Sequence, residues 1–440
     1  MTGRELRFPD QFLWGTATAA HQVEGNNTNN DWWAWEQGAG HIRNGDRSGL
    51  ACDWWQRAEE DFDRAQAMGQ NTHRLSVEWS RLEPRPGAWD PKAVERYRQM
   101  LSGLRRRGLE PVVTLFHFTA PLWLADLGGW ENPRTVEYFR RFTDRVVAEM
   151  GDLVQRWTPV NEPATYAFLA YMNGVFPPGK RSASSALTVL RHLLLGHGAA
   201  YHAIHGRQPD AQVGSVSNIF VAQPLPRHGL ADRLLARGVD FLHNIAPLEA
   251  VTTGRFKPPL GWSKAPELVN SADFLGVNYY TRFRLGVNWR RPADSFRLQL
   301  TPGAEVSDLD YGEVYPQGLY ETLMRVARYG KPIIITENGL PDHDDDQRPR
   351  FLLTHLAQVW RAIRDGAPVR GYYHWSLLDN FEWAQGYAMR FGLIEVDFAT
   401  QQRRIRASGR LFSEICRANA ITEDMVQRYA PAALEDIFGV

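Results

Sequence analysis

Short runs of apolar residues alternate along the chain with longer segments in which apolar residues recur every three or four positions. The short runs, such as Pro111–Phe116 and Ile333–Thr336, are continuously apolar, which is typical of parallel strands buried on both faces. The longer segments, such as Asp53–Met68, have the spacing of amphipathic helices, and Gly69 is placed to end that helix.

This alternation predicts eight strands, each followed by a helix. The predicted strands are Phe12–Ala17, His73–Val77, Pro111–Phe116, Arg156–Val160, Val213–Ser217, Phe274–Tyr279, Ile333–Thr336 and Val369–His374. The predicted helices are Asp53–Met68, Val94–Arg107, Thr135–Met150, Ala186–His205, Leu230–Asn244, Gln317–Tyr329, Arg350–Asp365 and Ser408–Ala418. Eight such units predict an α/β fold, a single (β/α)8 TIM barrel domain spanning residues 1–440. We expect the long segments after the first, sixth and eighth strands to be loops that shape a pocket.

Two of the predicted strands run directly into a glutamate. Arg156–Val160 is followed by Asn161-Glu162-Pro163, and Ile333–Thr336 is followed by Glu337-Asn338-Gly339. Pro163 cannot continue a strand ladder, so Glu162 is expected in an extended or turn conformation. Because a TIM barrel gathers the carboxyl ends of its strands on one face, the pattern predicts paired carboxylates at the mouth of the barrel.

Other polar or aromatic residues stand at the same strand ends. They are Gln22, Arg74, His117, Asn161, Asn278, Tyr280 and Trp375. Any one of them is explained equally well by a structural hydrogen bond, but their gathering on one face favours a binding site. The set suits a neutral polyhydroxylated ligand better than a phosphate or a metal, and the chain has no Gly-rich phosphate loop.

Two carboxyl groups can together cleave an acetal. One protonates the leaving oxygen, and the other meets the oxocarbenium-like carbon; at a separation of about 5–5.5 Å the second attacks directly and configuration is retained. A carboxyl group beside another carboxylate has a raised pKa and can stay protonated, whereas a neighbouring Arg keeps a carboxylate ionised. Arg74 is the candidate for that Arg, and the sequence leaves the distance between Glu162 and Glu337 open.

Composition narrows the class of partner. The formal net charge of zero argues against nucleic acid or an anionic membrane surface. The 16 tryptophans offer flat apolar faces that suit sugar rings, although most are expected in the core.

Cys52 and Cys416 are far apart and have no metal-type spacing. No apolar run has the length of a membrane span, and Phe12–Ala20 lacks the continuous apolar core of a signal peptide, so we expect a cytoplasmic protein.

A cluster of acidic residues follows Glu337. It comprises Asp342, Asp344, Asp345 and Asp346. A calcium site there is an alternative to a solvated loop, and the solvated loop is favoured because exposed acidic runs are common. We therefore expect neither a metal nor a cofactor.

The motifs together resemble glycoside hydrolase family 1, the β-glucosidase and β-galactosidase family, along nearly the whole chain. The resemblance is specific because all the segments occur in the family's order. They are Phe12–Ala17 through Gln22 and Glu24-Gly25, Arg74 through Trp79-Ser80-Arg81, Thr114–His117, Thr158–Pro163, Gly276–Tyr280, Ile335–Gly339 and His374–Trp383.

The resemblance implies a role for each matching residue. Glu162 is expected to be the general acid and then the base, and Glu337 the nucleophile. Tyr280 and Arg74 are expected to hold and ionise Glu337, and Asn161 to bond the sugar 2-hydroxyl. The resemblance further implies a set of substrate-binding residues: Gln22, His117, Glu382 and Trp383 for the remaining hydroxyls, Trp375 for stacking, and Asn278 and Phe391 beside them.

The chain departs from the family pattern at a few positions. His21 stands where many members have Tyr, and Phe118 where many have Trp. The short segment Asn244–Gly261 implies a reduced outer wall around the aglycone. Glu382 together with Arg390-Phe391 favours a free hexose over a hexose 6-phosphate.

The most favoured hypothesis is a retaining exo-β-glycosidase that hydrolyses terminal β-D-glucosides, and also galactosides and fucosides, through a covalent glycosyl-enzyme. Its partner would be a small β-glycoside or oligosaccharide, and the oligomeric state stays open. A transglycosylase with the same residues is an alternative. A non-catalytic carbohydrate-binding barrel is disfavoured because both Glu162 and Glu337 are present.

Overall fold

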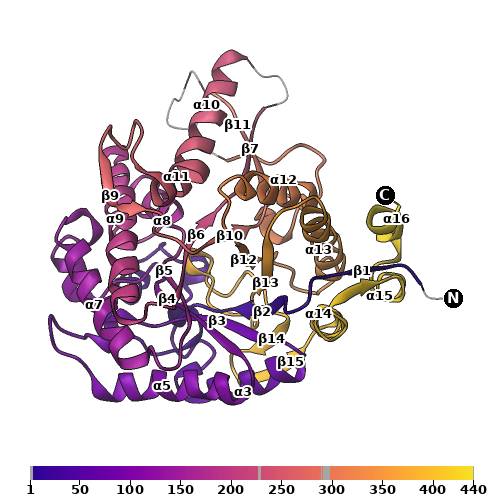
Figure 1. Cartoon of the computed structure of the whole chain (residues 1–440), viewed down its shortest axis with the longest axis horizontal. Coiled ribbons are helices and arrows are strands. Elements are labelled where there is room, and N and C mark those ends of the chain that lie inside the picture. Colours follow the sequence, from indigo (N-terminus) through magenta and orange to yellow (C-terminus); the bar gives the residue numbers. More distant parts are fainter. Residues whose placement is uncertain (1–2, 226–228, 289, 291–297, 440) are drawn as a thin grey trace.

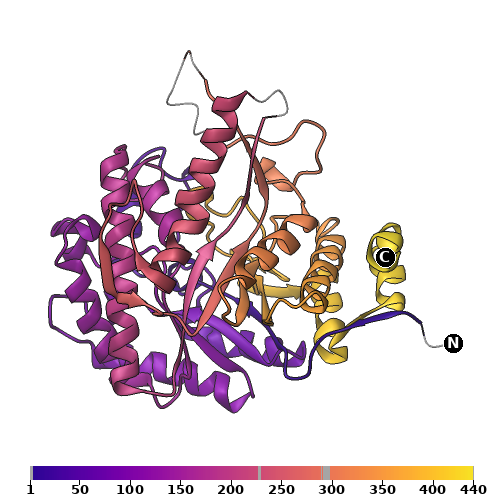
Figure 2. The ribbon, with the colours of Figure 1, turned by 45° about the horizontal axis from the view of Figure 1, so that its top comes forward.

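Eight parallel strands close into a barrel at the centre of the molecule (Figures 1 and 2). The computed structural model describes residues 3–225, 229–288, 290 and 298–439. The barrel confirms the predicted (β/α)8 architecture, and the strand limits agree with the predicted ones to within two residues. In barrel order the strands are β2 (Leu13–Ala17), β3 (Thr72–Ser76), β4 (Glu110–Phe116), β5 (Arg156–Val160), β6 (Gln212–Asn218), β10 (Phe274–Tyr279), β12 (Ile333–Asn338) and β13 (Val369–Trp375).

Amphipathic helices surround the barrel, as the periodic segments predict (Figure 2). Their ends follow local chemistry: α5 begins after Asp90, whose carboxylate accepts the amide N–H of Lys92 at 2.8 Å, and Pro91 occupies its first turn. The outer helices are α3 (Trp54–Ala67), α5 (Pro91–Arg106), α7 (Thr135–Met150), α9 (Ala183–Arg207), α11 (Ala246–Thr253), α12 (Pro316–Ala327), α13 (Arg348–Arg364) and α14 (Ala407–Ala418).

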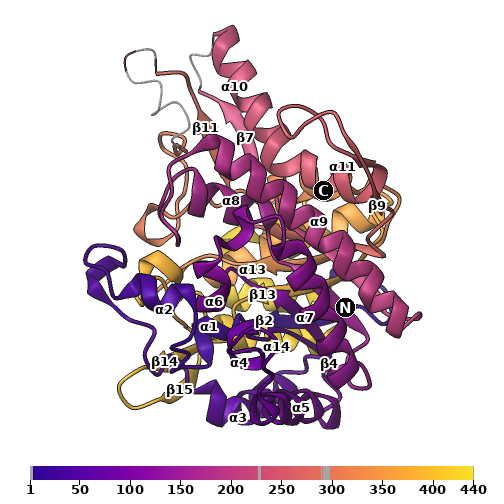
Figure 3. The same cartoon turned by 90° about the vertical axis from the view of Figure 1, so that its left-hand side faces the viewer.

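The helix predicted over Leu230–Asn244 begins where it was predicted, but its end differs. The α-helix α10 (Leu230–Asp240) ends early, and the chain passes through a π turn (Phe241–Ile245) into α11. Pro247 has no N–H for the helical bond to residue 243, which favours the wider turn. Figures 1 and 3 show α10 projecting from the body beside β7 (Val221–Pro224) and β11 (Arg282–Leu285), while α11 packs on α9 and β6.

Small two-stranded sheets, which the sequence analysis did not predict, tie the ends of the chain and the loops together. The strand β1 (Glu5–Arg7) pairs with β16 (Ala420–Thr422), so the two ends of the chain lie on the same side of the barrel (Figure 1). The other pairs are β7 with β11, β8 (Gly254–Arg255) with β9 (Lys264–Val269), and β14 (Ile394–Asp397) with β15 (Gln402–Ile405).

Short helices follow several of the strand ends. They are α1 (Ala20–Val23), α2 (Asp31–Glu36), α4 (Trp79–Leu82), α6 (Leu122–Asp126) and α8 (Pro163–Tyr171), with α15 (Glu423–Tyr429) and α16 (Leu434–Phe438) near the end of the chain. Within the described ranges, none of the helices combines the length and the apolar character needed to cross a bilayer.

Candidate active site

Parallel register brings the predicted residues to one end of the barrel. Asn278 is paired with Glu337 across β10 and β12, and with Asn218 across β10 and β6. Glu162 follows β5 and precedes the first residue of α8, Pro163. Its backbone has a φ of 43°, a left-handed conformation that is uncommon for a residue with a side chain and recurs at functional sites.

Both oxygens of the Glu337 carboxylate have a donor. The Tyr280 hydroxyl donates to one at 2.5 Å, and the Arg74 guanidinium donates to the other. Arg74 is only 1% exposed, and its second terminal nitrogen donates to the Asn161 side-chain oxygen at 2.7 Å. The buried charge of Glu337 is therefore compensated by a cation, and that cation is itself hydrogen-bonded.

Glu162 has amide donors instead of a cation. Asn278 donates to one carboxylate oxygen at 2.6 Å, and Asn218 donates to the other at 3.2 Å. Burial raises the pKa of Glu162 to about 7, and the nearby charge of Glu337 adds to the rise. The two carboxyl groups therefore differ in environment, and burial favours the protonated form of Glu162.

A chain of side-chain amides connects the two carboxyl groups. The Asn161 side-chain oxygen accepts from Arg74 and from Asn278, the latter at 3.3 Å, so its N–H group faces Nε2 of His117 at 3.2 Å. Burial, together with the charge of Arg74, holds the pKa of His117 well below its usual range. Nε2 of this neutral ring accepts from Asn161, and Nδ1 therefore carries the proton.

Several buried polar atoms at this end of the barrel have no hydrogen-bond partner among the described residues. They include Nδ1 of His117, the side-chain oxygen of Gln22 and Nε of Arg74. The Gln22 amide nitrogen donates to Asn380 at 2.9 Å and to Glu382 at 3.1 Å, which directs the oxygen elsewhere. Burial raises the pKa of Glu382 to about 8, although the bond from Gln22 opposes this rise. Unpartnered buried groups are rare, and ligand hydroxyls would supply the missing partners.

Aromatic rings stand beside these polar groups. Trp375 and Trp383 both stack against His117, with ring centroids 6.0 and 6.1 Å away. Phe391 meets Tyr280 edge-on at 6.3 Å. The structure thus brings together every residue that the sequence analysis named for the site.

Two further residues of the site escaped the sequence analysis. Asn218, which bonds Glu162, ends β6 one residue beyond the predicted limit of that strand. A polar residue at the end of a strand is the sequence signal that could have identified it. Tyr311 meets Phe391 edge-on at 5.3 Å and Tyr280 at 6.0 Å. It belongs to the long segment after β10, where no periodic pattern marks it.

Comparison with known proteins fits this geometry. The model of the family described as glycosyl hydrolase family 1 matches residues 4–421. The chain belongs to this family. It is 31% identical to a β-galactosidase of Pyrococcus woesei over 94% of this chain and 98% of that protein, and 35% identical to a β-glucosidase of an Agrobacterium species over 93% and 95%. Among solved structures, a β-glycosidase from Pyrococcus horikoshii superimposes with a TM-score of 0.90 at 38% identity, covering 97% of this chain and 98% of that one.

Family membership and these relatives make the chain a glycoside hydrolase that acts on O-glycosyl bonds. The paired carboxyl groups at the carboxyl ends of the strands are its candidate active site.

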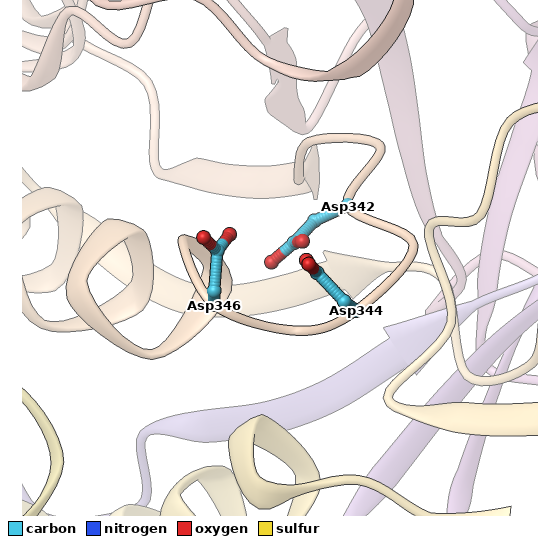
Figure 4. Close-up of side chains that lie close together, drawn as sticks. All are labelled: Asp342, Asp344 and Asp346. Carbon is cyan, nitrogen blue, oxygen red and sulfur yellow. The ribbon is translucent and has the colours of Figure 1, made fainter.

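The acidic cluster of this family 1 chain lies in the loop between β12 and α13. Figure 4 shows the carboxylates of Asp342, Asp344 and Asp346 close together, and their oxygens lie within 4.8 Å of one another. Asp342 is buried and already accepts the amide N–H groups of Asp345, Gln347 and Arg348 at 3.0, 3.0 and 2.8 Å. Its carboxylate is therefore explained by capping the start of α13, and the other two are exposed.

Replacing Asp342 should destabilise the fold without any involvement of metal. We expect Asp342→Ala to lower the free energy of unfolding by about 2 kcal/mol, because buried N–H donors lose their acceptor. Asp344→Ala is the matched control and should stay within about 0.5 kcal/mol of the wild type. Chemical denaturation with and without calcium measures both variants. A calcium-dependent rise in wild-type stability that both variants lose would contradict the capping explanation.

The pKa of Glu162 should respond to its amide donors. Asn218→Ala removes a donor that favours the ionised carboxylate, so the pKa of Glu162 should rise. Since the acid acts in its protonated form, the alkaline limb of kcat/KM should move to higher pH by less than about one unit. Gln99→Ala, which removes an exposed amide on α5, should leave the limb unchanged. A shift of the Asn218→Ala limb to lower pH would show that Glu162 is not the titrating acid.

Proposed function

We propose that the chain is a retaining exo-β-glycosidase that hydrolyses terminal β-D-glucosides, and also β-galactosides and β-fucosides. The observation that carries the proposal is the unequal environment of the two carboxyl groups. Glu337 bonds a cation and a phenol, which suits a nucleophile, whereas amides surround Glu162 and burial raises its pKa to about 7, which suits an acid.

In the proposed first step, Glu162 donates its proton to the glycosidic oxygen while a Glu337 oxygen attacks the anomeric carbon. The aglycone leaves as an alcohol, and the sugar stays bound to Glu337 as an ester. Esterification removes the charge of Glu337, which is one of the causes of the raised pKa of Glu162. That pKa therefore falls, and the Glu162 carboxylate can take a proton from water.

In the proposed second step, the oxygen of that water attacks the anomeric carbon and Glu337 leaves as a carboxylate. Glu162 regains its proton, so both groups return to their starting state. Two displacements at one carbon restore the original configuration.

The polar groups around the carboxyl pair support a free hexose as the sugar. A sugar would find an acceptor in the Gln22 side-chain oxygen and a donor in Nδ1 of His117. The carboxyl group of Glu382 can act as either a donor or an acceptor near neutral pH. Trp375 and Trp383 add flat faces for the ring of the sugar. Asn161, held by Arg74, is proposed to bond the 2-hydroxyl.

Removing the Glu337 carboxylate tests the mechanism. We expect Glu337→Gln to lower kcat on aryl β-glucosides, galactosides and fucosides by about 10⁴-fold or more, because no covalent intermediate can form. The control, Glu395→Gln on the β14–β15 hairpin, should keep full activity. For the wild type, proton NMR should show the β-anomer of the free sugar as the first product. The α-anomer as first product would contradict retention.

A further inference from the structure

A cavity of about 350 Å³ lies beside the paired carboxyl groups. Its walls come from α8, the segment after β6, the π turn that follows α10, and the segments after β10. The apolar side chains of these walls include Phe168, Met172, Phe220, Leu242, Phe283 and Leu298.

The cavity reaches the reacting groups through residues that serve both. Asn218 and Tyr280 line it, and they donate to Glu162 and to Glu337 respectively. Thr165, one turn along α8 from Glu162, lines it as well. A general acid must touch the oxygen that joins the sugar to its leaving group. The cavity is therefore placed to receive a leaving group whose oxygen meets Glu162.

About half of the lining residues are polar, and most of these already bond within the protein, as Asn218 does to Glu162, Tyr280 to Glu337 and Thr281 to the carbonyl oxygen of Glu313. No Asp, Glu, Lys or Arg occurs among the described residues that line the cavity. His243 is buried, stacks against Phe168 and lies 4.7 Å from the ring centroid of Phe220, and burial lowers its pKa to about 4, so the ring is neutral. Every hydroxyl of a buried sugar needs a hydrogen-bond partner, whereas a hydrocarbon gains from burial alone.

We propose that this cavity, on the leaving-group side of the site, selects an apolar aglycone, an alkyl chain or one aromatic ring, over a second sugar. The proposal rests on the glycosidase function proposed above and adds the class of leaving group. The volume lies at the low end of the range of about 300–1,000 Å³ found for ligand pockets, which suits a short chain or a single ring.

A homologous series of substrates tests the proposal on the wild-type enzyme. Alkyl β-glucosides from ethyl to octyl have leaving alcohols of similar acidity, so differences in kcat/KM report contacts of the chain. We expect kcat/KM to rise about threefold to fourfold per methylene until the cavity is filled, and cellobiose to be cleaved less efficiently than hexyl β-glucoside. Comparing benzyl with hexyl β-glucoside shows whether a ring or a chain fills the space better.

The outcomes separate the two proposals. A series that stays flat with chain length, with cellobiose preferred, would overturn the apolar aglycone site and leave the glycosidase function intact. Failure to hydrolyse any of these glucosides would overturn both.

Substitutions in the wall locate the effect. Leu242→Asn places a polar group in the cavity and should lower the octyl-to-ethyl ratio of kcat/KM by about tenfold. Leu234→Asn is the matched control: Leu234 is 56% exposed on α10 and lies outside the lining, so the ratio should not change.

Calorimetric binding of octyl and methyl thio-β-glucosides gives the same comparison without turnover. Equal Kd values for the two compounds in the wild type would contradict the proposal even if Leu242→Asn failed to fold.

Discussion

The buried ion pair between Arg74 and Glu337 is the interaction on which the rest of the site depends. The two residues come from β3 and β12, which β2 and β13 separate in the barrel, so the pair exists only because the barrel closes. The same guanidinium also bonds Asn161 at the end of β5. Either charge alone at this depth would destabilise the fold by about 3–5 kcal/mol, so the fold and the reactive carboxylate rely on each other.

The ion pair also determines what Glu162 can do. The Arg74 guanidinium donates to Glu337 and Asn161, whereas the Glu162 carboxyl group accepts from the side-chain amides of Asn278 and Asn218. Amides stabilise a carboxylate less than a cation does, so burial prevails and the pKa of Glu162 rises. One cation beside one of two neighbouring carboxyl groups therefore gives them different environments, and this difference underlies the proposed roles of acid and nucleophile.

The sequence was informative where a side chain is placed by the barrel itself. Strand limits, and with them Arg74, Glu162 and Glu337, follow from short apolar runs, because parallel strands buried on both faces leave a clear pattern. Sequence patterns mislead where tertiary packing overrides the local pattern. The amphipathic segment Leu230–Asp240 does form a helix, but it projects beside β7 and β11 instead of covering the barrel, and nothing in its periodicity indicates which surface it meets. Tyr311 was missed because it, too, is placed by tertiary packing, and no periodic pattern marks its segment.

These failures fall in one region, and that region forms the proposed leaving-group side of the site. The groups proposed to bind the sugar stand at or near the ends of β2, β4, β5 and β13, where the barrel leaves them little freedom. The apolar cavity is built instead from α8, the π turn and the segments after β6 and β10, and of its lining residues Asn218 and Tyr280 also bond the carboxyl pair. Changes in those walls can alter the accepted aglycone without displacing Arg74 from Glu337. The chemistry of the site is therefore constrained by the fold, whereas its choice of leaving group is constrained only by local packing.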